Sequence, residues 1–149
     1  PMTYPPTGFD LRQSRGGSVS IEHIYPQTPE HRSWKDGFPR SKKEQKLLQN
    51  SLGNLLALSQ SINSSLQNDP FEEKKRVKRG DGGQVLRAGY ANGSHSEIAV
   101  SEYHSWTPSE IKSRGLDMIR FMERRWKINI ASDSERLELL NLSFLDEGR

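Results

Sequence analysis

A short run of strand-forming residues carries a carboxylate and an imidazole at adjacent positions, Glu22 and His23. The run spans residues 18–24, where the residue types suit a short strand, and Pro26 ends it. Neighbouring side chains on a regular strand point to opposite faces. Glu22 and His23 can therefore serve one site only if the strand bends or ends beside them. This limits the segment to a short strand followed by a loop.

Two asparagines further along the chain give the Glu22–His23 pair its context. Asn54 ends a turn, and the short apolar run over 55–58 that follows suits either a strand or a buried helix by its periodicity. Asn63 lies nine residues after Asn54, on the helix expected next. A strand–loop–strand–helix arrangement would bring Asn63 over Glu22 and His23.

The remaining segments predict a mainly helical surround within one domain over 18–149. Residues 1–17 are rich in Pro, Gly and Ser and are interpreted as a linker or lead-in. Thr107, Pro108 and Glu110 form a capping box that starts a helix reaching about Lys127. The other expected elements are a helix over 41–49, a basic helix over 70–79, a loop over 80–96 with room for a short hairpin, and closing helices within 107–142.

Composition narrows the chemistry that the chain can carry. There is no cysteine, which excludes disulfides and cysteine-ligated zinc, and no apolar run approaches the length of a membrane span. The net charge of +3 says little because the basic residues are clustered. These clusters could meet phosphates or form solvated helix faces. They are Lys74, Lys75, Arg76, Lys78 and Arg79, and then Arg120, Arg124, Arg125 and Lys127.

The candidate residues suit the hydrolysis of a phosphodiester. That reaction needs a base to take a proton from water, a cation to stabilise the charged phosphorane, and basic groups to hold the backbone. His23 suits the base because the ordinary pKa of histidine lies near neutrality. The oxygens of Glu22 and Asn63 suit magnesium or manganese. The three tryptophans, Trp34, Trp106 and Trp126, are expected in the core.

Together these residues resemble the HNH (His-Me finger) nuclease motif, in which Asp-His-Ile-x-Pro is followed by Asn-Leu and then by His or Asn at the same offset. The resemblance is closest to the C-terminal nuclease domain of GmrSD-type, modification-dependent restriction enzymes. It covers about residues 18–128. The segments that carry it are Ile21-Glu22-His23-Ile24-Tyr25-Pro26-Gln27, Leu52-Gly53-Asn54-Leu55, Asn63, the run from Asn68 to Lys75, and Trp106-Thr107-Pro108 with Ile111, Arg114 and Trp126.

The resemblance implies an α+β fold with a small ββα-metal (HNH) core, over about residues 18–68, embedded in a mainly helical domain. It also implies that His23 is the general base, that Glu22 and Asn63 ligate one divalent metal, and that Asn54 braces the loop that orients the histidine. Lys74 matches a lysine that could contact phosphate.

Two positions depart from the family pattern. Glu22 stands where Asp is commoner, and no second histidine follows Asn63, where zinc-binding relatives carry one. Gln67 or Asn68 would be the nearest further oxygen donor. The resemblance therefore favours Mg²⁺ or Mn²⁺ over zinc.

The implied function is that of a metal-dependent DNA endonuclease domain of a bacterial, cytoplasmic anti-phage restriction protein. Its implied partners are DNA and an N-terminal NTPase-like sensor domain or partner subunit of the same system. No association with a membrane is expected. The chain does not begin with methionine, and we expect either a fragment of a longer protein or a processed chain. Two alternatives from other classes stay open: a non-catalytic DNA-binding module that retains the fold, and a helical module that docks on the sensor domain.

Overall fold

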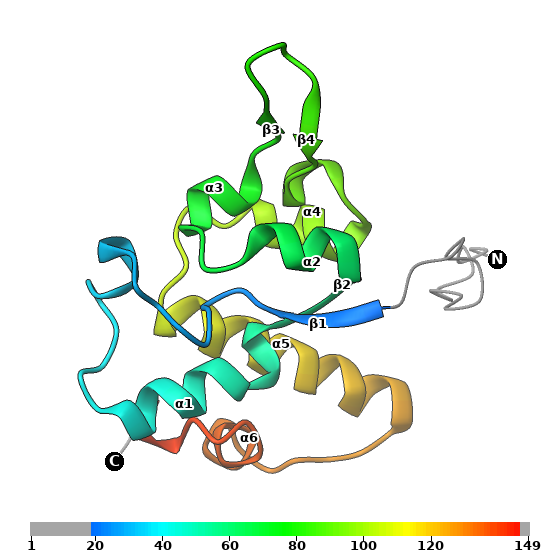
Figure 1. Cartoon of the computed structure of the whole chain (residues 1–149). Helices are drawn as coiled ribbons and strands as arrows, with labels where there is room; N and C mark the ends of the chain where they lie inside the picture. The colour runs from blue at the N-terminus through cyan, green and yellow to red at the C-terminus, as the bar shows by residue number, and fades with distance from the viewer. Residues whose placement is uncertain (1–18, 147–149) are drawn as a thin grey trace, which may run out of the picture.

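Helices surround the first of two small antiparallel sheets in the computed structural model, which describes residues 19–146, and the second sheet projects from the body (Figure 1). The first sheet pairs β1 (Val19–His23) with β2 (Leu55–Ser59), and the second pairs β3 (Lys78–Arg79) with β4 (Val85–Arg87). In Figure 1, helices α2, α3 and α4 lie on one side of the first sheet and α1, α5 and α6 on the other. The expected α+β class is confirmed for the described residues, and the expected lead-in over 1–17 lies outside them.

Along the chain, helices lie between the strands and follow the last of them. The α-helices are α1 (Lys42–Asn50), α2 (Gln60–Leu66), α3 (Phe71–Lys75), α4 (His95–Ser101), α5 (Pro108–Trp126) and α6 (Asp133–Leu139). Short 3₁₀ turns are η1 (Arg32–Trp34), η2 (Leu52–Asn54), η3 (Tyr90–Asn92) and η4 (Ser143–Leu145). Among the described residues, no helix combines the length and the apolar character that crossing a membrane requires.

The register of the first sheet decides which face Glu22 occupies. Glu22 pairs with Leu56 and His23 with Leu55, so the apolar run over 55–58 is a strand. Directly opposed residues of an antiparallel pair project to the same face. Leu56 is 3% exposed and Glu22 4%, whereas Ile21 is 53% exposed. Glu22 therefore points into the protein, and α2, which follows β2 at once, packs against both strands.

An aromatic cluster fixes the long connection between β1 and α1. The ring of Tyr25 stacks on Phe38 at a centroid distance of 3.9 Å, and Trp34 lies 5.8 Å from Tyr25. All three side chains are buried. Aromatic pairs at such distances stabilise a core beyond the area that they bury. The loop that follows Pro26 is therefore held at a defined place beside the end of β1.

The expected basic helix over 70–79 is wrong in its second half. Helix α3 ends at Lys75, Arg76 is extended, and Lys78 and Arg79 form β3. The guanidinium of Arg87 donates to the carbonyl of Glu73 at 2.9 Å, which satisfies a group that the next helical turn would otherwise have used. The expected loop over 80–96 likewise contains β4, η3 and the start of α4.

The closing helices agree with their sequence signals. Thr107 caps α5, and its capping box with Glu110 is present. Trp34 and Trp106 are buried as expected, but Trp126 is 60% exposed, so its expected core position is wrong. Trp126 is the last residue of α5, where Lys127 turns into the left-handed region with a φ of 54°. The indole therefore lies at the exposed end of α5 rather than in the core.

A close approach of η2 to α5 sets the position of Asn54. A Cβ on Gly53 would overlap the backbone carbonyl oxygen of Ile111 and lie 2.9 Å from the nitrogen of Gly115. We expect Gly53→Ala to lower the free energy of unfolding by about 1–3 kcal/mol or more, because backbone atoms of α5 cannot move aside. Urea unfolding followed by circular dichroism measures this.

Gly115→Ala is the matched control for Gly53→Ala. A Cβ there would meet the side-chain end of Leu140, which can shift. Replacing a helical glycine by alanine also gains about 1 kcal/mol. The control should therefore stay close to the wild-type stability. Equal losses in the two variants would contradict the proposed packing.

Candidate functional site

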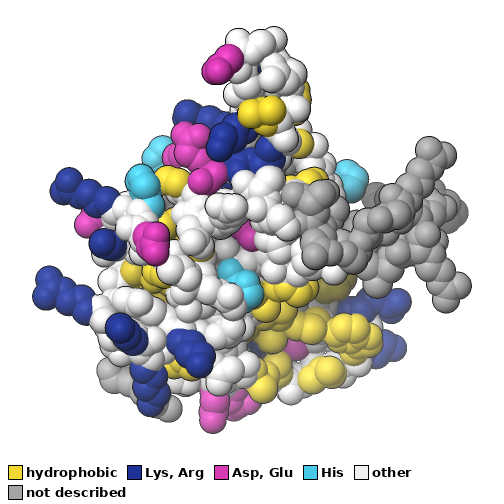
Figure 2. All heavy atoms as spheres, viewed as in Figure 1, with side chains coloured by type: hydrophobic (Ala, Val, Ile, Leu, Met, Phe, Trp, Pro, Cys, Tyr) yellow, Lys and Arg dark blue, Asp and Glu magenta, His cyan; other side chains and the backbone are white. Residues whose placement is uncertain are grey.

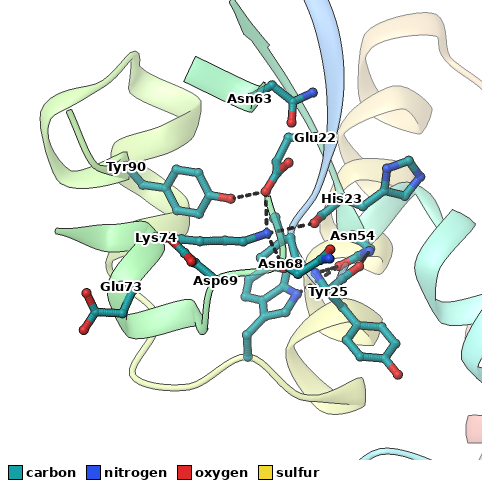
Figure 3. A network of polar contacts seen from close by, with 12 residues as sticks. Glu22, His23, Tyr25, Asn54, Asn63, Asn68, Asp69, Glu73, Lys74 and Tyr90 are labelled. Atoms are coloured by element: carbon teal, nitrogen blue, oxygen red, sulfur yellow. Dashed lines mark hydrogen bonds and ion pairs between the residues drawn. The ribbon is translucent and has the colours of Figure 1, made fainter. Parts of the chain in front are cut away.

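Three of the predicted site residues line one shallow pocket. Glu22, His23 and Asn63 lie in its wall together with the loop over 26–28 and the end of α2, and its volume is about 270 Å³. The pocket follows the free edge of β1, where the amide nitrogen of Asn63 donates to the carbonyl of Ile21 at 3.0 Å. Side chains from both faces of a strand can reach a pocket at its edge and end. Glu22 and His23 thus share a site although they leave β1 in different directions (Figure 3).

Two donors hold one oxygen of the Glu22 carboxylate. The Nζ of Lys74 lies 2.6 Å from Oε1, and the hydroxyl of Tyr90 donates to the same atom at 2.9 Å. Burial, and then the charge of Glu22, raises the pKa of Tyr90 well above its usual value, so the phenol stays protonated and donates. Within the described residues, no hydrogen bond involves the other oxygen, Oε2. The carboxylate is therefore fixed in direction with one oxygen left for the pocket.

The amide of Asn63 is oriented by its own hydrogen bonds. Its nitrogen donates to the Oγ of Ser20 at 2.8 Å and to the carbonyl of Ile21. Because a carbonyl can only accept, the NH₂ group must face β1 and the amide oxygen must face away from it. In Figure 3 this oxygen points toward Glu22. The pocket thus presents one carboxylate oxygen and one amide oxygen to a common space.

The imidazole of His23 is half-buried beside Gln27. Its Nε2 lies 3.4 Å from the side-chain nitrogen of Gln27. Burial lowers the pKa of His23, and the neighbouring Glu22 carboxylate opposes that shift. A lowered pKa keeps the imidazole neutral at pH 7, the form that accepts a proton.

Asn54 lies behind the pocket rather than in its wall. Its Oδ1 accepts from the backbone nitrogen of Tyr25 at 2.8 Å and from the indole nitrogen of Trp106 at 3.0 Å. Its Nδ2 donates to the carbonyls of Tyr25 at 2.9 Å and Gln49 at 3.0 Å. The side chain is 0% exposed. Asn54 therefore joins the end of α1, the segment before α5 and the chain just after β1. Its contact with that last segment is at Tyr25, two residues after His23.

The predicted basic cluster is divided by the fold. Lys74 is 0% exposed, and its Nζ also donates to the carbonyls of His23 and Ile24, so it cannot contact a DNA phosphate. The prediction that Lys74 contacts DNA is therefore wrong. Lys74 instead forms a buried ion pair with Glu22. Lys75 is engaged with Glu72 and the carbonyl of Tyr103. Arg76, Lys78 and Arg79 are exposed and stay candidates for DNA contact.

The sequence reasoning missed Tyr90 and Gln49. Tyr90 binds Glu22, and the side chain of Gln49 donates to the carbonyl of Pro26 at 3.0 Å, which holds the loop that lines the pocket. Gln49 had no signal beyond its place in a helix. Tyr90 had a weak one, since a large aromatic residue inside a glycine-rich segment needs something to pack against. Gln67 and Asn68, the expected further donors, do line the pocket.

The described residues contain no group of three or more His, Cys, Asp and Glu side chains that could hold a metal ion. The oxygen ligands that the pocket offers are the single carboxylate of Glu22 and the side-chain amide of Asn63, with Gln67 and Asn68 also in its wall. Any cation there would complete its coordination with water and with oxygens of a substrate.

The family described as "GmrSD restriction endonucleases, C-terminal domain" matches residues 4–121. No curated protein and no solved structure matches the chain.

Proposed function

Since the chain belongs to the family of C-terminal domains of GmrSD restriction endonucleases, we propose that it is a metal-dependent nuclease that hydrolyses DNA phosphodiester bonds. The family indicates a nuclease domain of restriction systems, and DNA is the substrate that such a domain implies. The observation that carries the finer proposal is the meeting of Glu22, His23 and Asn63 in one pocket.

The arrangement of the elements supports an HNH-type ββα-metal core. β1 carries Glu22 and His23, β2 pairs with it, and α2 carries Asn63 across the free edge of β1. The connection from β1 to β2 carries α1 and is held by Asn54. This order and these positions agree with the roles that the motif implies for the four residues.

Glu22 and Asn63 would hold one divalent cation, Mg²⁺ or Mn²⁺. Their donor atoms are hard oxygens, and Mg²⁺ is commonly bound through one or two carboxylates, waters and substrate phosphates. Zinc favours several imidazole or thiolate ligands, and the described residues contain no cluster of such side chains. When bound, a divalent cation supplies positive charge to the phosphorane and to the leaving 3′-oxygen.

His23 would remove the proton from the attacking water. Its neutral imidazole lies in the wall of the same pocket, and side chains hold the backbone directly after it. Lys74 binds the carbonyl of His23, and Asn54 binds both backbone groups of Tyr25. These contacts hold the imidazole in place without touching it, which lowers the cost of orienting the base in the transition state.

In its biological setting the domain would cut or nick foreign DNA in the cytoplasm of a bacterium. An N-terminal NTPase-like sensor domain of the same system would recognise the DNA modification and deliver the substrate. The family description, which names restriction endonucleases and a C-terminal position, supports this division of labour.

Cleavage of supercoiled plasmid DNA tests the proposal directly. With Mg²⁺ or Mn²⁺ we expect nicked or linear product, and with EDTA we expect none. In parallel, calorimetric titration with Mn²⁺ should show binding to the wild type and about tenfold weaker binding to Glu22→Gln, because a metal-binding charge is lost. Thermal unfolding checks that this variant is folded at the temperature of the titration, since it also leaves Lys74 without its partner. DNA binding without product under every condition would support the non-catalytic alternative, and equal cleavage in EDTA would refute metal dependence.

A further inference from the structure

The β3–β4 hairpin projects from the body of the protein (Figure 1). Every residue from Lys78 to Leu86 except Gly80 is exposed. The turn is nonetheless closed, since Gly80 donates to the carbonyl of Gln84 at 2.9 Å and Gly83 donates back to Gly80 at 2.9 Å. The hairpin thus keeps a definite shape while its surface takes no part in the core.

Hydrogen bonds and close backbone packing hold the base of this hairpin against the rest of the protein. Arg87 is 5% exposed, and its guanidinium donates to the carbonyls of Ser65 and Glu73 and to the carboxylate of Asp69. Gly89 packs against the backbone of Lys75 and Arg76 so closely that a Cβ would overlap their carbonyls. The two legs of the hairpin are therefore locked to each other and to the end of α2.

Short segments also connect both legs to residues that bind Glu22. Lys74 lies four residues before β3, Tyr90 lies three residues after β4, and both bind the same oxygen of Glu22. Four residues span at most about 14 Å of extended chain, which corresponds to about four steps along one DNA strand at 3.4 Å each. The start of the hairpin thus lies within about four nucleotide steps of Lys74, whose side chain binds Glu22 of the pocket.

The exposed surface of the hairpin suits a nucleic acid. Residues 76–86 carry three basic side chains, Arg76, Lys78 and Arg79, against the single acidic Asp81. Figure 2 shows Lys and Arg side chains beneath the projecting hairpin, with Asp and Glu side chains among them. Val85 and Leu86 are 56% and 58% exposed. Two-stranded antiparallel ribbons fit DNA grooves, where basic groups meet phosphates and apolar groups meet sugars or thymine methyls.

We propose that the β3–β4 hairpin is a DNA-contacting arm that sets the position of the duplex relative to the Glu22–Asn63 pocket. This inference rests on the proposed nuclease function. Lys78 and Arg79 bind the phosphate backbone, while Val85 and Leu86 contact the groove. The shared anchoring of both legs at Glu22 keeps the bound strand at a constant distance from the site.

Salt-dependent binding of a fluorescent DNA duplex in EDTA tests the arm without any cleavage. We expect Lys78→Ala/Arg79→Ala to bind on the order of tenfold more weakly near physiological salt, with a slope of log K against log[salt] that is smaller by about 1.8, since two phosphate contacts are lost. Arg124→Ala/Arg125→Ala removes the same charge from the end of α5 and should keep the wild-type slope. Val85→Ser/Leu86→Ser should weaken binding while leaving the slope unchanged.

Wild-type affinity and slope in Lys78→Ala/Arg79→Ala, or equal losses in the two charge variants, would overturn the arm. These outcomes are separable from failure of the nuclease proposal. If the wild type cleaves DNA but the hairpin variant binds normally, the arm is wrong and the nuclease stands. If nothing is cleaved but only the hairpin variants lose affinity, the arm stands and the nuclease is wrong.

Discussion

His23→Ala is expected to lower the rate of DNA cleavage by about 10²–10⁴-fold, the usual cost of removing a general base. The substitution should leave the fold intact, because the imidazole is only half-buried and the contacts that hold this segment come from the backbone groups of His23, Ile24 and Tyr25. Single-turnover cleavage of a labelled duplex with Mg²⁺ measures the rate, and thermal unfolding checks the fold.

His104→Ala is the matched control for this loss. His104 is exposed and does not line the pocket that contains Glu22, His23 and Asn63. The control should cleave at the wild-type rate. A His23→Ala protein with full activity in Mg²⁺, or one that fails no more than His104→Ala, would remove His23 from the mechanism.

Lys74→Met is expected to cost about 3–5 kcal/mol of unfolding free energy, the range typical of breaking a buried ion pair from one side. The substitution leaves the buried carboxylate of Glu22 without its cation and takes the shared donor from the carbonyls of His23 and Ile24. Urea unfolding measures the loss. A purely exposed lysine, as the DNA-contact prediction assumed, would cost almost nothing.

A double variant separates the ion pair from simple loss of packing. Lys74→Met combined with Glu22→Gln leaves no unpaired buried charge, so it should be more stable than Lys74→Met alone. If the second substitution instead adds its full independent cost, Lys74 does not stabilise the protein through Glu22.

The features that the sequence predicted well depend on local patterns. The capping box at Thr107, the strand ending before Pro26 and the turn at Asn54 each follow from neighbouring residues, and the structure has all three. The match to the restriction-endonuclease family was likewise predicted from the residues around Glu22, His23 and Asn54. Short-range signals of this kind do not depend on how distant segments meet.

The features that the sequence predicted wrongly or missed depend on distant partners. Lys74 lies in a run of charges that looks solvated, yet a carboxylate 52 residues earlier draws it into the core. Helix α3 stops early because Arg87, from the following strand, binds a carbonyl near its end. Tyr90 bonds to Glu22 across 68 residues. The pattern of residues within a short stretch of sequence cannot predict contacts between residues so far apart in the chain.

The hydrogen bonds of Asn54 can form only in stages while the protein is being synthesised. Three of its hydrogen bonds involve residues 25 and 49, which are synthesised before Asn54. The fourth involves the indole of Trp106, which is synthesised 52 residues later. Synthesis from the N-terminus therefore delivers Glu22, His23 and Asn63 well before the donor that completes the brace behind them. A growing chain contains the candidate site residues early and acquires their final support only when the segment before α5 arrives.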